Sequence, residues 1–190
     1  MSGSSKVHLG TMLVAIDPGS TGAGAAAWGT DEWPSHAIAW TWRKSEVWIA
    51  NTTGEWLASC DHDLAEAEIA GLLPLGAVVL VEGLFQPRGA MRGRFSVGST
   101  LPLAEHVGRL IQAIRGRYRV RSVLRPLSDD WRPAVGIPAR TQRDRAEGHA
   151  VEIAWRAGWR MGGTKAAIGA ASEAVCMYRA ARVGLPECAR

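Results

Sequence analysis

The stretch Leu13-Val14-Ala15-Ile16-Asp17-Pro18-Gly19-Ser20-Thr21-Gly22 decides how this chain folds. A short apolar run bounded by glycine and proline is typical of a buried β-strand, and Asp17 stands where that strand ends. A buried charge needs a compensating partner, because burying it alone costs a large free energy. The position of Asp17 therefore suggests a metal site.

A second run repeats this arrangement further along the chain. Ala77-Val78-Val79-Leu80-Val81 is apolar and leads directly into Glu82-Gly83. It predicts another buried strand that delivers a carboxylate to a loop beginning with glycine. Two carboxylates at strand ends can share divalent metal ions.

The bulk composition indicates one soluble domain. With 190 residues, of which 47% are hydrophobic, we expect a single domain over residues 12–190 preceded by a flexible lead over residues 1–11. No apolar run approaches the roughly 20 residues that span a bilayer, and the N-terminus lacks the pattern of a signal peptide. We therefore expect a cytoplasmic protein without a membrane partner. Three cysteines without paired spacing indicate reduced thiols.

The net charge of +4 hides a regional asymmetry. Residues 82–160 carry fifteen arginines and no lysine against seven acids, whereas residues 1–81 carry three basic and nine acidic residues. Arginine is well suited to bidentate contacts with phosphate, so the basic region favours a polyanionic partner. A general enrichment of arginine by a GC-rich genome is the alternative, and the clustering after Glu82 favours nucleic acid.

The order of expected elements indicates an α/β protein with a sheet covered on both faces. Residues 131–138 are interpreted as a turn-rich connection. Expected strands cover residues 12–17, 22–28, 40–50, 77–82 and 119–125, and expected helices cover residues 64–71, 99–116, 141–158 and 165–182.

A two-metal phosphodiesterase needs carboxylates from separate elements that converge on ions about 4 Å apart. Asp17 and Glu82 supply two of them. The third is expected from the last helix, where Glu173 lies among small residues that allow a close approach to a sheet edge. A solvated helix face is the alternative for Glu173. The cluster of Asp144, Glu147 and His149 is explained by pairing with arginines one helical turn away.

Three motifs in this order resemble a known family. Asp17-Pro18-Gly19-Ser20, then Val81-Glu82-Gly83-Leu84-Phe85, then Glu173-Ala174 are similar to the motifs of RuvC-type Holliday junction resolvases in the RNase H-like nuclease superfamily. The resemblance spans residues 12 to about 182 in element order. It implies an RNase H-like mixed five-stranded sheet flanked by helices on both faces. It also implies a homodimer that nicks branched DNA at a four-way junction with Mg²⁺.

The resemblance also implies roles for individual residues. Asp17, Glu82 and Glu173 carry over as ligands of two Mg²⁺ ions, for which Mn²⁺ is expected to substitute. Independently of the resemblance, Lys165 at the start of the last helix is a candidate contact to the scissile phosphate, because it lies roughly 12 Å along the helix axis from Glu173. DNA contacts are expected from the basic loop over residues 83–98, namely Phe85, Arg88, Arg92 and Arg94.

The chain departs from the family pattern in the last helix. The family usually places two acidic or histidine ligands there, three residues apart, and Ala170 stands at the first of these positions. Alanine cannot coordinate a metal. Either three carboxylates suffice, or the register differs, or position 170 carries an inactivating substitution.

Three functions follow as hypotheses. The first is a structure-selective DNA endonuclease that resolves Holliday junctions or other branched DNA. The second is a catalytically silent RNase H-like module that binds DNA junctions. The third is a fragment of a sugar kinase or actin-like ATPase, because Asp17-Pro18-Gly19-Ser20-Thr21-Gly22 also resembles the phosphate-binding hairpin of that superfamily.

The aromatic side chain in the basic loop gives a first prediction. Stacking of an aromatic ring on an unpaired base contributes about 1–3 kcal/mol. Phe85→Ala should therefore weaken binding to a four-way junction, measured as a change in junction affinity. An unchanged affinity would remove Phe85 from the DNA-binding residues.

Overall fold

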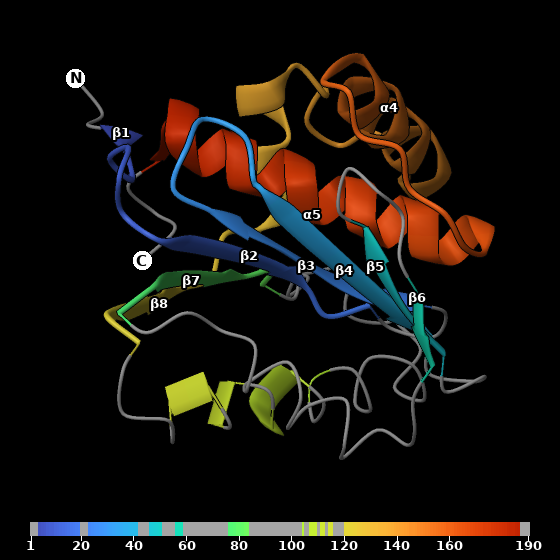
Figure 1. The fold of residues 1–190 in the computed structure, drawn as a ribbon. Helices are drawn as coiled ribbons and strands as arrows, with labels where there is room; N and C mark the ends of the chain where they lie inside the picture. Colours follow the sequence, from blue (N-terminus) through green and yellow to red (C-terminus); the bar gives the residue numbers. More distant parts are fainter. Residues whose placement is uncertain are drawn as a thin grey trace.

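The computed structural model of the chain describes residues 4–19, 23–41, 46–50, 56–58, 76–83, 104, 107–109, 111–112, 114–115 and 120–186. Figure 1 shows a twisted sheet with the C-terminal helices on one face and the helical segment within residues 104–115 on the other. The expected α/β architecture, with helices on both faces of the sheet, is confirmed.

Most of the described strands come first along the chain, and the helices with assigned bounds follow them. The strands are β1 (Ser4–Ser5), β2 (Leu13–Asp17), β3 (Ala23–Gly29), β4 (His36–Thr41), β5 (Glu46–Ala50), β6 (Trp56–Ala58), β7 (Val78–Val81), β8 (Ser122–Leu124) and β9 (Leu185–Pro186). The helices are α3 (Ser128–Trp131), the 3₁₀ turn η2 (Pro133–Val135), α4 (Arg143–Arg156) and α5 (Lys165–Val183).

The main sheet has the order β6-β5-β4-β3-β2-β7-β8. Within it, β4, β3 and β2 pair antiparallel, whereas β2, β7 and β8 pair parallel. These five strands are the expected mixed sheet. β5 and β6 extend it beyond β4 by antiparallel pairing.

One expectation about local structure was wrong. Residues 40–50 were expected to form a single strand, but they contribute to two antiparallel neighbours, β4 and β5. β4 begins earlier than expected, at His36, because Ala37 and Ala39 around Ile38 give only a weak strand signal in the sequence. Residues 131–138 are rich in turns as expected, and they also include the end of α3 and the 3₁₀ turn η2.

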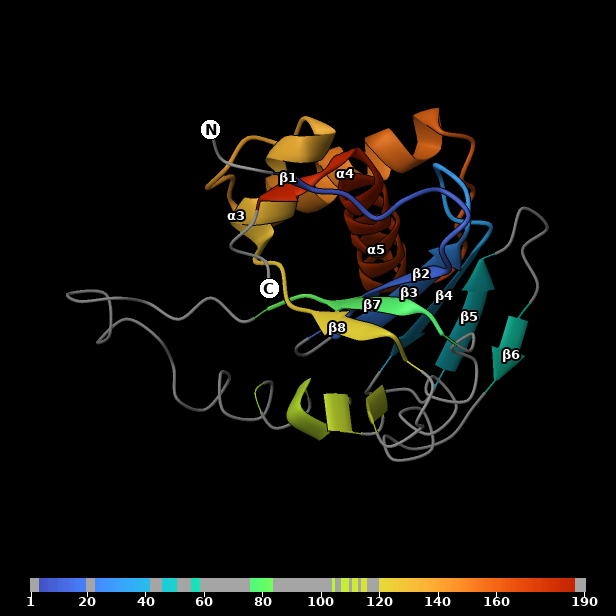
Figure 2. The same cartoon turned by 90° about the vertical axis from the view of Figure 1, so that its left-hand side faces the viewer.

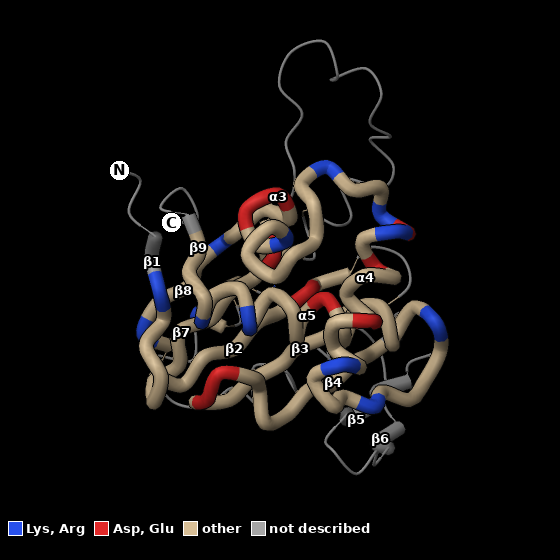
Figure 3. Tube along the Cα trace, turned by 90° about the horizontal axis from the view of Figure 1, so that it is seen from above, with Lys and Arg blue, Asp and Glu red and all other residues tan. Residues whose placement is uncertain are grey.

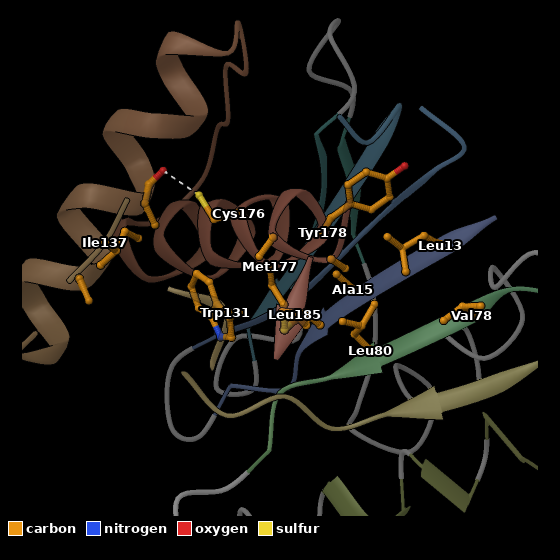
Figure 4. Close-up of a cluster of buried hydrophobic side chains, with 14 residues drawn as sticks. Leu13, Ala15, Val78, Leu80, Trp131, Ile137, Cys176, Met177, Tyr178 and Leu185 are labelled. Atoms are coloured by element: carbon orange, nitrogen blue, oxygen red, sulfur yellow. Dashed lines mark hydrogen bonds between the residues drawn. The ribbon is translucent and has the colours of Figure 1, made fainter. Parts of the chain in front are cut away.

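α5 lies directly on the sheet because small residues line the contact. Ala167, Ala171 and Ala174 pack against a group of buried alanines on β3 and β4. With methyl groups on both sides, the helix backbone can approach the strands closely. Larger side chains complete this layer toward one end, where Met177 and Tyr178 of α5 lie over Leu13 and Leu80 (Figure 4).

The opposite face of the sheet is covered by the helical residues between 104 and 115. Val107 and Ile114 are buried there against Val14, Ile16 and Val79. Figure 2 shows the three resulting layers edge on. β2 and β7 are therefore buried on both faces, which explains their uninterrupted apolar runs.

Residues 4–11, set apart from the fold in the sequence, are held to the domain at several points. β1 pairs with β9, and the Val7 N–H donates to the carbonyl of Ala181. The buried guanidinium of Arg182 donates to four backbone carbonyls and to the Tyr178 hydroxyl, which donates in turn to the carbonyl of Asp31. The four carbonyls belong to Val7, His8, Thr11 and Gly29. Among the described residues, no helix is both long and apolar enough to cross a bilayer.

The Arg182 contacts predict a large loss of stability on substitution. Arg182→Met should lower the free energy of unfolding by about 3 kcal/mol, because it leaves several buried carbonyls without a donor. The change is measured by denaturant unfolding.

Arg156→Met is the matched control. Arg156 pairs with Glu152 one turn away, and both side chains are mostly exposed. Such a pair contributes about 0–1 kcal/mol. Equal losses in the two variants would contradict a structural role for Arg182.

Candidate functional site

Asp17 is the last residue of β2 and its side chain is held by the turn that follows. The Gly19 N–H donates to Asp17 Oδ1 at 3.0 Å. Gly19 has a φ of 62°, and a Cβ at this position would overlap the carbonyl of Ala23. Glycine is therefore required for the turn that fixes the Asp17 carboxylate.

Glu82 follows β7 immediately and lies next to Asp17. β2 and β7 are parallel neighbours in which Ile16 pairs with Val81, and the Glu82 N–H donates to the carbonyl of Ile16 at 2.9 Å. Both strands end at the same edge of the sheet. The pairing therefore brings together two carboxylates that lie 65 positions apart in the sequence.

Glu173 reaches the same place from α5. Its side chain is buried, with the residue 9% exposed, although it lies in the middle of a helix. The close packing of α5 on the alanines of β3 and β4 carries Glu173 toward the ends of β2 and β7. Figure 3 shows several acidic positions gathered between α3, α4 and α5.

Two residues that the sequence did not identify hold the glutamates. Trp131 Nε1 donates to Glu82 Oε1 at 3.1 Å, and Arg132 donates through a terminal guanidinium nitrogen to Glu173 Oε1 at 3.0 Å. Arg132 also stacks on the Trp131 ring, and its Nε is buried without a hydrogen-bond partner. The clue in the sequence was an arginine beside a tryptophan in a segment interpreted as a turn.

The three carboxylates act on one another electrostatically. Burial and then the charges of Glu82 and Glu173 raise the pKa of Asp17 well above its usual value. Burial and then the charge of Glu173 raise the pKa of Glu82 to about 7. Burial also raises the pKa of Glu173, and the nearby Arg132 opposes that shift. The structure thus brings together the three acids that the sequence singled out.

Positive charge reaches the cluster from α4 as well. Arg143, the first residue of α4, lowers the pKa of all three carboxyl groups, although its own side chain is exposed. The cluster nevertheless holds more acidic than basic groups, which is the charge balance of a cation site.

The donors fit a hard divalent cation, with one qualification. Asp17, Glu82 and Glu173 offer carboxylate oxygens, which Mg²⁺ and Mn²⁺ prefer. Among the residues that the structure describes, however, no three His, Cys, Asp or Glu side chains are already arranged to hold an ion. The Arg132 guanidinium occupies one oxygen of Glu173, so an ion would compete with it there.

Of the remaining predicted site residues, two lie on α5 and four lie outside the described residues. Lys165 is exposed at the first residue of α5, eight residues before Glu173. Ala170 is buried among the alanines that face β3. Phe85, Arg88, Arg92 and Arg94 lie outside the described residues.

The raised pKa of Glu82 predicts how stability depends on pH without metal. A glutamate in the unfolded chain loses its proton near pH 4.5, whereas folded Glu82 keeps it to about pH 7. Between these values the folded state binds more protons, so the free energy of unfolding should fall as the pH rises. Thermal melting in EDTA measures this slope.

Glu82→Gln isolates the contribution of this side chain, because glutamine does not titrate. The variant should show a flatter decline than the wild type from pH 4.5 to pH 7. Parallel profiles in the two proteins would show that Glu82 keeps an ordinary pKa.

The comparisons with known proteins agree with this architecture. No protein-family model matches the sequence, and no curated protein sequence matches it significantly. Among solved structures, RuvC of Thermus thermophilus aligns with a TM-score of 0.52 at 13% identity, over 93% of this chain and 99% of that one. The structure of T. thermophilus RuvC in complex with a Holliday junction substrate aligns with a TM-score of 0.48, with the same identity and coverage. The chain therefore has the RNase H-like fold of RuvC.

Proposed function

We propose that this protein is a structure-selective endonuclease that cleaves branched DNA, with the four-way Holliday junction as its substrate. The observation that carries the proposal is the meeting of Asp17, Glu82 and Glu173 at one edge of a RuvC-like sheet. These three carboxylates come from β2, β7 and α5, as a two-metal phosphodiesterase requires. The arginine-rich region of the sequence supplies a partner surface for DNA.

In this proposal Asp17, Glu82 and Glu173 hold two Mg²⁺ ions, and Mn²⁺ substitutes for them. Bound ions of this kind activate a water and stabilise the leaving oxygen of the phosphodiester. Trp131 donates to Glu82 Oε1 and thereby restrains the orientation of this side chain. Arg132 orients Glu173 in the same manner.

The basic side chains around the carboxylates have a role with the DNA backbone. Arg132 and Arg143 lie close enough to the cluster to lower the pKa of its acids, so they can neutralise a phosphate brought beside it. Lys165, Arg88, Arg92 and Arg94 are proposed as further phosphate contacts. Phe85 is proposed to stack on an unpaired base. Symmetric cutting of a junction calls for two active sites, hence a homodimer.

A catalytically silent junction-binding module is the second candidate. Two observations favour it: Ala170 replaces an expected ligand, and Arg132 pairs with Glu173 within the cluster. An internal arginine can replace a metal ion as the counter-charge of an acidic cluster. The sugar kinase or actin-like ATPase hypothesis has no such support, because the structural likeness to RuvC extends over 93% of the chain.

A cleavage and binding assay on a labelled four-way junction tests the endonuclease. The wild type should cleave the junction in Mg²⁺ and leave a linear duplex of the same sequence intact. Asp17→Asn should bind the junction but no longer cleave it, because one carboxylate of the metal site is lost. Cleavage by Asp17→Asn at the wild-type rate would rule the proposal out.

Ala170→Asp separates the two candidate functions in the same assay. If the wild type and Ala170→Asp both bind the junction and only Ala170→Asp cleaves it, the protein is a resolvase inactivated at position 170. Because position 170 is buried among alanines, the melting temperature of the variant is the control for folding. The absence of junction binding and cleavage in both proteins would refute both candidates.

A further inference from the structure

Alanine at position 170 supplies no ligand, and its surroundings are apolar. Ala170 is buried in the apolar cluster formed by α5 with β3 and β4. The residue before it is different. Gly169 faces α4, because a Cβ added there would overlap the side chain of Glu147.

Glu147 therefore lies across the surface of α5, over Gly169. Residues four apart in a helix share one face, so Gly169 and Glu173 are neighbours on the surface of α5. The proximity has an electrostatic consequence, since the negative charge of Glu147 contributes to raising the pKa of Glu173. Glu147 is partly buried, unlike the exposed Glu152 further along α4.

The presence of glycine at position 169, inside α5, also needs a physical explanation. Glycine destabilises the interior of a helix relative to alanine, and α5 is otherwise rich in alanine. The space left by the missing Cβ is filled by the Glu147 carboxylate. Gly169 thus makes room for an acid from α4 one helical turn from Glu173.

We propose that Glu147 supplies the carboxylate that position 170 lacks, so that the divalent-cation site draws on α4 as well as on β2, β7 and α5. The inference rests on the proposed function, because it concerns the same metal site. It assigns the cluster four acids, namely Asp17, Glu82, Glu147 and Glu173. The ligand is a hard divalent cation, for which carboxylate oxygens are the preferred donors.

Titration calorimetry with Mn²⁺ tests the inference without relying on cleavage. Glu147→Gln should weaken Mn²⁺ binding by about 10-fold or more, the order of loss seen when groups that support a metal site are removed. Glu152→Gln removes the same charge from the same helix and should bind Mn²⁺ as the wild type does. At about 1 M salt the Debye length is about 3 Å, so remote charge effects are screened and a direct contact is not.

A second pair of variants moves the carboxylate without removing it. Gly169→Ala places a methyl group where the Glu147 carboxylate lies and should also weaken Mn²⁺ binding by about 10-fold. Gly148→Ala is the matched control, because a Cβ at Gly148 meets no atom within 4 Å. Thermal melting establishes that each variant is folded.

The outcomes distinguish failure of this inference from failure of the proposed function. Weaker Mn²⁺ binding by Glu147→Gln and Gly169→Ala, with both controls unchanged, supports it. Wild-type affinity in Glu147→Gln overturns it and leaves the three-carboxylate site standing. Mn²⁺ binding that is absent from the wild type, or equal in the wild type and Asp17→Asn, overturns the proposed metal site and this inference together.

Discussion

The constraint on which this structure depends is the burial of three like charges in one place. Asp17, Glu82 and Glu173 come from three elements, and each is removed from bulk water. Burying acids together is unfavourable both because they lose hydration and because they repel one another. The surrounding chain compensates with the Gly19 N–H, the Trp131 indole and the guanidinium of Arg132.

The architecture of the domain follows from bringing these acids together. Parallel pairing of β2 and β7 puts Asp17 and Glu82 at one edge of the sheet. Alanines on both sides of the contact let α5 approach that edge with Glu173. After β8 the chain continues into α3. Trp131, the last residue of α3, contacts Glu82, and the next residue, Arg132, contacts Glu173. The unfavourable burial of charge at this corner is offset by the apolar packing on both faces of the sheet.

The same residues bear on the two functions proposed above, a nuclease and a silent binding module. Arg132 stabilises Glu173 as an ion pair, and a divalent cation at that carboxylate would take over part of this role. Buried ion pairs gain little net stability, because the cost of desolvation offsets much of the attraction. A cation that binds several carboxylates at once therefore competes with Arg132 on favourable terms. The position of Glu147 over Gly169 adds to the negative charge that would attract such an ion.

Several features could be predicted from the sequence because they depend on local patterns. The apolar runs before Asp17 and Glu82 indicated buried strands, and helical periodicity placed α4 and α5 to within a few residues. The strand at 36–41 started outside the predicted range, since alanine gives no clear strand signal. The five-stranded core came from the family resemblance, and the structure added β5 and β6 at its edge.

The acids at the strand ends could be recognised in the sequence, because a charged residue directly after an apolar run is a local pattern. The residues that surround these acids depend on tertiary packing. Trp131 and Arg132 lie 49 and 41 positions from the glutamates that they hold, and no local pattern links residues so far apart. The approach of Glu147 to α5 depends on a missing methyl group at Gly169, which acquires meaning only when two helices pack together. Such contacts arise from packing between elements, and a periodicity along the chain does not encode them.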